Sequence, residues 1–156
     1  MKGYYLAQEG HVVNALPPVD ITGGKTSQAI SLKNWGHATL LVLIGLSAAA
    51  FNKIIVNACS DAAGDNPVAI PFNLFACETA GGDVNTGRQA ILAAGYTPSA
   101  NDGIFYVIEL DAAELPQGSP YVQVQLTNGV NSVIASVVAV LSGGRFAGDQ
   151  SATVLV

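Results

Sequence analysis

Three short runs of β-branched and aromatic residues in the C-terminal third constrain the fold more than any other part of the chain. They span residues 104–110, 121–127 and 132–141, and turn-forming residues separate them. Runs this short and this rich in Val, Ile and Tyr favour strands over helices. Residues 103–146 therefore predict three strands in an antiparallel β unit.

The side-chain patterns of these runs predict how much of each strand is covered. In residues 121–127, Val122, Val124 and Leu126 alternate with polar residues, which is typical of a strand with one face on the core. Residues 132–141 carry apolar side chains on both faces. That pattern predicts a strand covered on both sides, either by a second sheet or by a neighbouring subunit.

The connections between these runs carry turn chemistry. Asp111 and Glu114 have the spacing of a capping box and Pro116 follows, so we expect a single helical turn there. The dipeptide Asn128-Gly129 tolerates positive φ and predicts a tight turn.

The same reasoning extends to the rest of the chain. It predicts further strands within residues 29–35, 38–46, 52–60 and 68–79, with a turn at 34–37 and a bend at Pro71. The run 38–46 is so apolar that we expect it to lie centrally. Two interpretations of residues 86–94 stay open, one or two helical turns or a strand after a long loop.

Together these segments predict the fold class. Seven or eight short strands without a βαβ rhythm indicate an all-β protein, an antiparallel two-sheet β-sandwich with jelly-roll or related Greek-key topology. We expect one domain over residues 28–156.

Residues 1–27 differ from this domain in composition and in hydrophobic pattern. They contain paired tyrosines, prolines and glycines and show no sustained hydrophobic period, which predicts an extended N-terminal arm with a short strand at Val12 and Val13. The arm carries enough apolar residues to dock on another surface. We expect Tyr4, Tyr5, Val12 and Val13 to contact a partner.

Composition points to a surface covered by other protein. Half of the residues are hydrophobic, only 11% are charged, and the mean hydropathy is +0.41. The net charge is -5, with four lysines against two acids up to residue 60 and two arginines against nine acids beyond it. We expect no nucleic-acid partner, because no basic cluster is present to neutralise phosphates.

The sequence also predicts a cytoplasmic origin. The N-terminus lacks the apolar stretch of a signal peptide, and the longest uncharged apolar run, 38–51, is shorter than the ~20 residues that cross a bilayer. We therefore expect no membrane association. In a cytoplasm Cys59 and Cys77 stay reduced, and we interpret them as small buried hydrophobes.

Two fragments resemble nucleotide-binding signatures without completing them. The run Gly23-Gly24-Lys25-Thr26 matches the end of a P-loop, but Val19 stands where the motif needs its first glycine. Residues 141–145, LSGGR, resemble the signature of ABC-type ATPases, yet they follow a predicted strand and open no helix. We expect no nucleotide and no other cofactor.

The remaining polar residues do not assemble a catalytic set. His11 and His37 lack metal-ligand spacing, and neither serves a cysteine as a base, so we expect no catalytic or metal site and no enzyme. Calcium binding by the loop acids at 61, 65 and 83 stays open. A sugar platform would use Trp35, Tyr96 and Tyr106, although a lone Trp beside a strand more often belongs to the core.

Five blocks of sequence lie between about residue 31 and the C-terminus: SLKNWGHAT from residue 31, ACSDA from 58, AIPF from 69, FYVIELDAAEL from 105 and AVLSGGRFAG from 139. Together they resemble a family of small proteins that tailed phages and prophages encode among their head genes. These blocks are ordered strands and turns, without catalytic residues.

The resemblance implies a structural role in a virion. The expected function is that of a capsid decoration (cement) protein, which binds the outer surface of the major capsid protein shell and also itself, as a dimer or a trimer. Assembly would take place in the host cytoplasm. The alternatives are another virion structural subunit, of a tail or fibre, or a carbohydrate-binding adhesive module.

Overall fold

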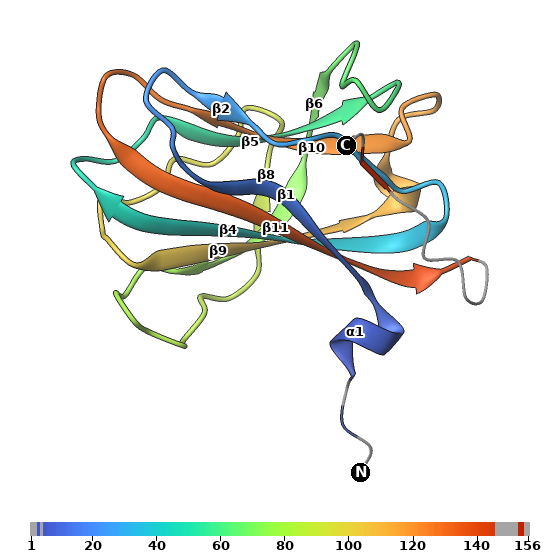
Figure 1. Cartoon of the computed structure of the whole chain (residues 1–156), viewed down its shortest axis with the longest axis horizontal. Coiled ribbons are helices and arrows are strands. Elements are labelled where there is room, and N and C mark those ends of the chain that lie inside the picture. Colours follow the sequence, from blue (N-terminus) through green and yellow to red (C-terminus); the bar gives the residue numbers. More distant parts are fainter. Residues whose placement is uncertain (1–2, 4, 146–152, 155–156) are drawn as a thin grey trace.

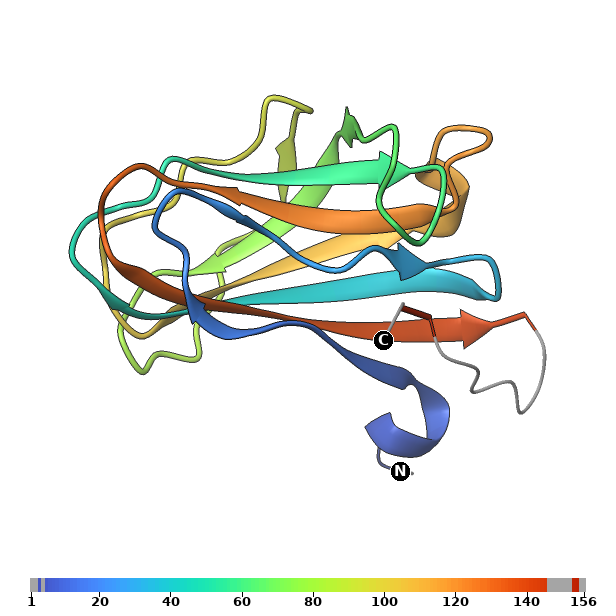
Figure 2. The same cartoon turned by 45° about the horizontal axis from the view of Figure 1, so that its top comes forward.

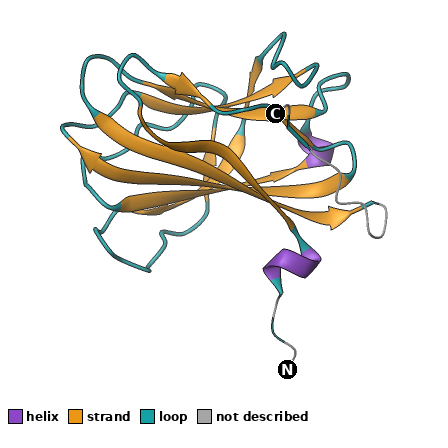
Figure 3. Cartoon of the chain, viewed as in Figure 1, coloured by secondary structure: helices purple, strands orange, loops and turns teal. Residues whose placement is uncertain are grey.

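Two antiparallel β-sheets packed face to face make up the computed structural model of the chain (Figure 1). The structure describes residues 3, 5–145 and 153–154. Figure 3 shows strands throughout, with helix confined to α1 (Leu6–Glu9) and the short 3-10 helix η1 (Ala112–Glu114). The predicted all-β, two-sheet antiparallel sandwich is confirmed.

The larger sheet has six strands in the order β1-β11-β4-β9-β7-β8. The smaller has the order β2-β10-β5-β6, with β3 also pairing with β10. Their bounds are β1 His11–Asp20, β2 Lys25–Thr26, β3 Ile30–Ser31, β4 Trp35–Ser47, β5 Lys53–Cys59, β6 Val68–Ile70, β7 Phe72–Cys77, β8 Gln89–Ile91, β9 Ile104–Asp111, β10 Tyr121–Thr127 and β11 Val133–Gly144.

Strand β4 is central in the larger sheet, as its apolar sequence predicts. It lies between β11 and β9, and its alternate residues Ala38, Leu40 and Val42 are fully buried against the smaller sheet. The strand begins at Trp35, so the turn expected over residues 34–37 is shorter than predicted.

The three C-terminal strands do not pair with one another, which corrects the expected β unit. Strands β9 and β11 both flank β4 in the larger sheet, whereas β10 pairs with β5 in the smaller one. Each connection therefore crosses between sheets, and the Asn128-Gly129 segment belongs to a crossover loop and not to a hairpin turn. The crossing lets the buried side of β10 pack against the larger sheet.

The predicted bend at Pro71 is a change of sheet. Strand β6 ends one residue before this proline and pairs with β5, and β7 begins one residue after it and pairs with β9. The open question about residues 86–94 is settled in favour of a strand, because β8 pairs with β7. The expected helical turn is η1, where the Asp111 amide donates to Glu114 Oε2 at 3.0 Å.

The N-terminal residues differ most from expectation. Strand β1 pairs with β11 along its length, and Ala15, Leu16 and Ile21 are buried in the core. Most of the segment predicted as an arm therefore belongs to the sandwich, because its inward side chains complete the core. Ahead of β1, α1 projects from the sheets with all four of its residues exposed (Figures 1 and 2).

Candidate interaction face

About half of the outward side chains of the larger sheet are apolar, and they lie mainly at its centre. On β11, Val133, Ala135 and Val137 point inward and are buried, while Ile134 and Val138 alternate with them on the outer side. The smaller sheet covers the inner side of β11. Within the described part of the chain nothing forms a third layer, so the strand predicted to be covered on both faces is covered on one.

Cross-strand register places these outer side chains in rows. One row runs through Asn14, Val138, Leu41, Val107 and Phe75, from β1 across β11, β4 and β9 to β7. A neighbouring row pairs Leu43 with Phe105. Directly opposite residues on one face of a sheet lie about 5 Å apart, so each row is a continuous strip of contacts.

We call this surface the outer face. Its apolar residues are exposed or half-buried, and they are Val12, Leu41, Leu43, Phe75, Phe105, Val107, Ile134, Val138 and Val140. The side chains of Val12 and Leu43 are 49% and 41% exposed. Contiguous apolar surface of this kind is typical of a site that contacts another protein.

A charged cluster marks one end of the outer face. The ring of His37 lies between two carboxylates, with Nδ1 2.6 Å from Asp111 Oδ1 and Nε2 2.5 Å from Glu109 Oε2. Thr39 Oγ1 donates to the same Glu109 oxygen at 2.8 Å. An imidazole can donate from both nitrogens only when it is protonated, so this geometry fits the imidazolium form.

The pKa of His37 reflects two opposing effects. Partial burial lowers the pKa, but hydrogen bonds and charge interactions with Asp111 and Glu109 outweigh burial and raise it above its ordinary value of 6.5. The cluster therefore favours the protonated, positively charged form of His37.

A shallow pocket of about 260 Å³ opens beside this cluster. Arg88 and Glu114 also line it, and Arg88 Nε donates to Asn73 Oδ1 at 2.9 Å. Among the described residues, no group of three or more His, Cys, Asp or Glu side chains is placed to hold a metal ion. The carboxylates of Asp111 and Glu109 are instead hydrogen-bonded to His37.

No protein-family model, curated protein or solved structure matches this chain. The described residues include no helix of the length and hydrophobicity needed to cross a membrane.

The residues predicted to contact a partner differ in their exposure. Val12 lies on the outer face, and Tyr5 is exposed beside α1. Val13 is 6% exposed and points into the core, which corrects its prediction as a contact residue, because neighbours on a strand face opposite sides of the sheet. Tyr4 lies outside the described residues.

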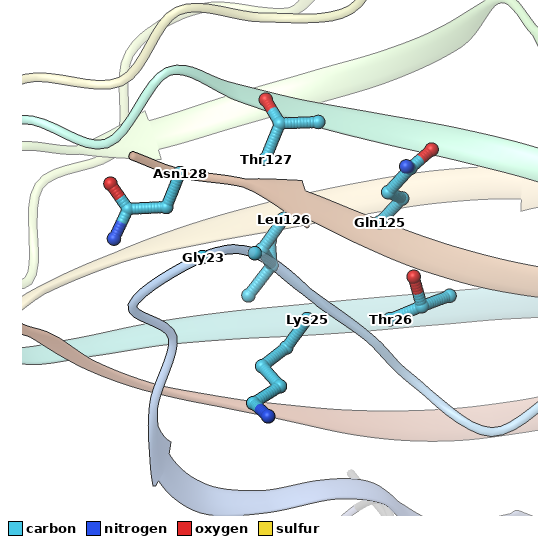
Figure 4. Close-up of a pocket in the computed structure, with 8 residues that line it drawn as sticks. Gly23, Lys25, Thr26, Gln125, Leu126, Thr127 and Asn128 are labelled. Carbon is cyan, nitrogen blue, oxygen red and sulfur yellow. The ribbon is translucent and has the colours of Figure 1, made fainter. Parts of the chain in front are cut away.

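The glycine-rich fragment borders a second pocket (Figure 4). This cavity of about 370 Å³ lies between residues 23–26 and the end of β10. Lys25 and Thr26 form strand β2, so the helix that a P-loop needs does not follow them. In Figure 4 the Lys25 side chain extends away from Gln125 and Thr127, and the pocket offers no arrangement for phosphates.

The aromatic residues considered for sugar binding do not form a platform. Trp35 is 4% exposed and stacks on His11, with ring centroids 5.6 Å apart. Tyr106 is buried, and its hydroxyl and that of Tyr96 both donate to Glu78 Oε1, at 3.0 and 3.1 Å. Trp35 therefore belongs to the core, as a lone Trp beside a strand more often does, and the exposed Trp35 that a carbohydrate-binding module would need is not present.

Both cysteines are buried and reduced, as predicted. Burial raises the pKa of Cys59, and the nearby charges of Asp61 and Asp65 add to the effect. The carboxylate of Asp61 accepts the amides of Ala63 and Asp65 at 3.0 and 3.1 Å, so it organises its own loop.

The His37 cluster is the feature that sequence reasoning missed. His37 was expected to be a turn or surface residue, but it lies on β4 opposite Asp111 of β9. The outward positions 109 and 111 on a predicted strand were the available signal. Their histidine partner is more than 70 residues away, and only strand pairing brings it to them.

Proposed function

We propose that this chain is a virion structural protein, a capsid decoration protein that binds the outer surface of a major capsid protein shell. The single observation that carries the proposal is the outer face, an apolar surface across five strands of a chain with few charges. Such a surface is stabilised when other polypeptide covers it.

The physical role follows from contact area. A rigid β-sandwich resists deformation because its two sheets share one core, and it can hold neighbouring capsid subunits together by spanning the contacts between them. Internal pressure from packed DNA would strain those contacts. A non-catalytic role also agrees with the shallow, open pockets beside His37 and Lys25.

The projecting N-terminal segment is the proposed capsid contact. Tyr5 and Leu6 are 52% and 40% exposed, and α1 stands clear of the sandwich (Figure 2). Strand β1 anchors this segment to β11. A short projecting element on a rigid base can enter a groove on a partner while the sandwich stays unchanged.

The test is whether virions contain the chain. Particles of the phage that encodes it should carry the chain in a fixed ratio to the coat subunit, and electron cryomicroscopy should place it on the outside of the head. A variant lacking residues 1–9 should fold yet leave the heads undecorated. Heads without the chain would contradict the proposal.

A second candidate is a tail or fibre subunit. The outer face favours it equally, since tail proteins also bury large surfaces against copies and neighbours. The same particle reconstruction separates the two, because density on the tail and not on the head identifies a tail component.

A further inference from the structure

We propose that the outer face is the interface of a homodimer, in which two copies stack their larger sheets face to face about a two-fold axis. The proposal deepens the proposed function, in that it names what covers the apolar surface on which that function rests. It assigns the outer face to a second copy and leaves the projecting N-terminal segment for the capsid.

The sheet edges are poor sites for association. Edge strand β1 contains Pro17 and Pro18, which cannot donate backbone hydrogen bonds, and its pairing with β11 is interrupted by bulges around them. In the smaller sheet, edge strand β6 has three residues and lies between Pro67 and Pro71. The other two edges, β8 and β2, have only three and two residues. Short or proline-containing edges discourage strand addition, which makes the faces the better sites for association.

The centre of the outer face suits contact with an identical surface. In a two-fold interface the same patch of both copies is in contact, and a residue on the axis contacts the same residue of the other copy. A charge at the centre would therefore face a like charge. The central row from Asn14 through Val138, Leu41 and Val107 to Phe75 is free of charge. This row can lie against its own copy without electrostatic conflict.

The charged residues lie where a dimer tolerates them. Glu109 lies in the row next to the central one, opposite Thr39, and Asp111 lies one row further out; both carboxylates are bonded to His37, which leaves no isolated negative charge. Asp20 lies toward the opposite end, opposite Ile134. An apolar centre with a polar rim is the usual anatomy of a protein interface.

The size of the face agrees with a stable dimer. Five strands spaced about 4.8 Å apart are roughly 24 Å wide, and eight paired residues, as between β4 and β9, extend roughly 26 Å. The product is on the order of 600 Å². Specific, stable interfaces bury about 600–1,000 Å² on each partner, so the face lies at the lower end of that range.

Sedimentation velocity on the full chain tests the proposal. We expect a dimer, and we expect Val138→Lys to raise the dimer Kd about a hundred-fold, because each copy would then bury a lysine without a partner charge near the apolar centre of the interface. The matched control is Val130→Lys, the same substitution at a loop residue that is 92% exposed and off the face. It should leave the dimer intact.

A second measurement does not depend on a disruptive substitution. A spin label on Ser136→Cys should show dipolar broadening from its counterpart, because sheets that stack face to face lie about 10 Å apart. The same label on Val130→Cys should show none. The native cysteines are buried and take no label. Far-UV circular dichroism establishes that each variant is folded.

The outcomes separate this inference from the proposed function. A wild-type monomer, a trimer, or a dimer that resists Val138→Lys would overturn the homodimer, whatever the chain does on virions. If the dimer dissociates as expected but virions lack the chain, the homodimer stands and the decoration role falls. If the chain is monomeric in solution and its outer face lies on coat protein in the particle, the face belongs to the capsid.

Discussion

His37 and Asp111 lie directly opposite each other on strands β4 and β9, and His37 Nδ1 is 2.6 Å from the Asp111 carboxylate. This pair ties the beginning of one strand to the end of the other. It also places a titratable charge at the border of the outer face, so protonation affects both the fold and that surface.

The stability of the fold should depend on the charge of His37. Its folded pKa is raised above 6.5, so its contribution is fully present below pH 6.5 and is lost as pH rises through the folded pKa. Thermal unfolding between pH 5 and 9 should show a decline in Tm that His37→Gln removes. The charged groups nearby are Glu109, Asp111, Glu114 and Arg88. An NMR titration that placed the His37 pKa below 6.5 would contradict this account.

Lowering the pH should remove the contribution of the Asp20 carboxylate to the stability of the fold. Its carboxylate accepts hydrogen bonds from Ser132 Oγ at 2.6 Å and Thr22 Oγ1 at 2.7 Å, which lower its pKa from 3.8 to about 2. The stabilisation is present above pH 3.8 and is lost as pH falls toward 2. Asp20→Asn should therefore lower Tm at pH 6, and the difference from wild type should shrink at pH 2. Asp83→Asn, in an exposed loop, is the control.

Truncation should divide the N-terminal residues into two parts. Removing residues 1–9 takes away α1, whose four residues are exposed, and should leave Tm nearly unchanged. Removing residues 1–27 also deletes the buried Ala15, Leu16 and Ile21, and a fully buried aliphatic side chain contributes about 1.5–3 kcal/mol. We expect a loss of about 5 kcal/mol or more, which most domains cannot tolerate. Urea unfolding measures both; equal stability of the two truncations would be the contrary result.

The hydroxyl of Tyr106 should contribute more to the free energy of unfolding than the hydroxyl of Tyr96. The Tyr106 oxygen donates to Glu78 and also accepts the Ser99 amide at 3.0 Å, so Tyr106→Phe leaves a polar group without its partner. We expect a loss of about 1–2 kcal/mol in the free energy of unfolding. Tyr96→Phe, at a half-buried position that keeps the Tyr106 bond to Glu78, should cost about half as much. Chemical denaturation of both variants makes the comparison.

Local patterns in the sequence predicted those elements that depend on interactions between residues close together in the chain. The alternation of Val122, Val124 and Leu126 identified the buried side of β10, and Pro71 marked the passage from one sheet to the other. The spacing of Asp111 and Glu114 located η1. Each of these signals lies within about ten residues of the structure it predicts.

The errors concern residues whose partners are distant in sequence. Strand β1 was expected to be part of an arm because Pro17 and Pro18 interrupt its pattern, yet pairing with β11 holds it in the sheet. Strands β9, β10 and β11 were grouped because they are consecutive, although they bind other strands. The side chains of β11 indicated a strand covered on both faces, whereas the described chain covers only the inner one.

By itself, the sequence determined that this protein is built from short antiparallel strands, with few charges and a large share of apolar surface. Only the tertiary structure decided that Val138 meets Leu41 on an exposed face and that His37 meets Asp111 at its end. The physical reason is that side-chain alternation is a property of one strand. Register and sheet order depend on contacts between residues as far apart in the sequence as His11 and Leu141, and those contacts form only when the whole core packs.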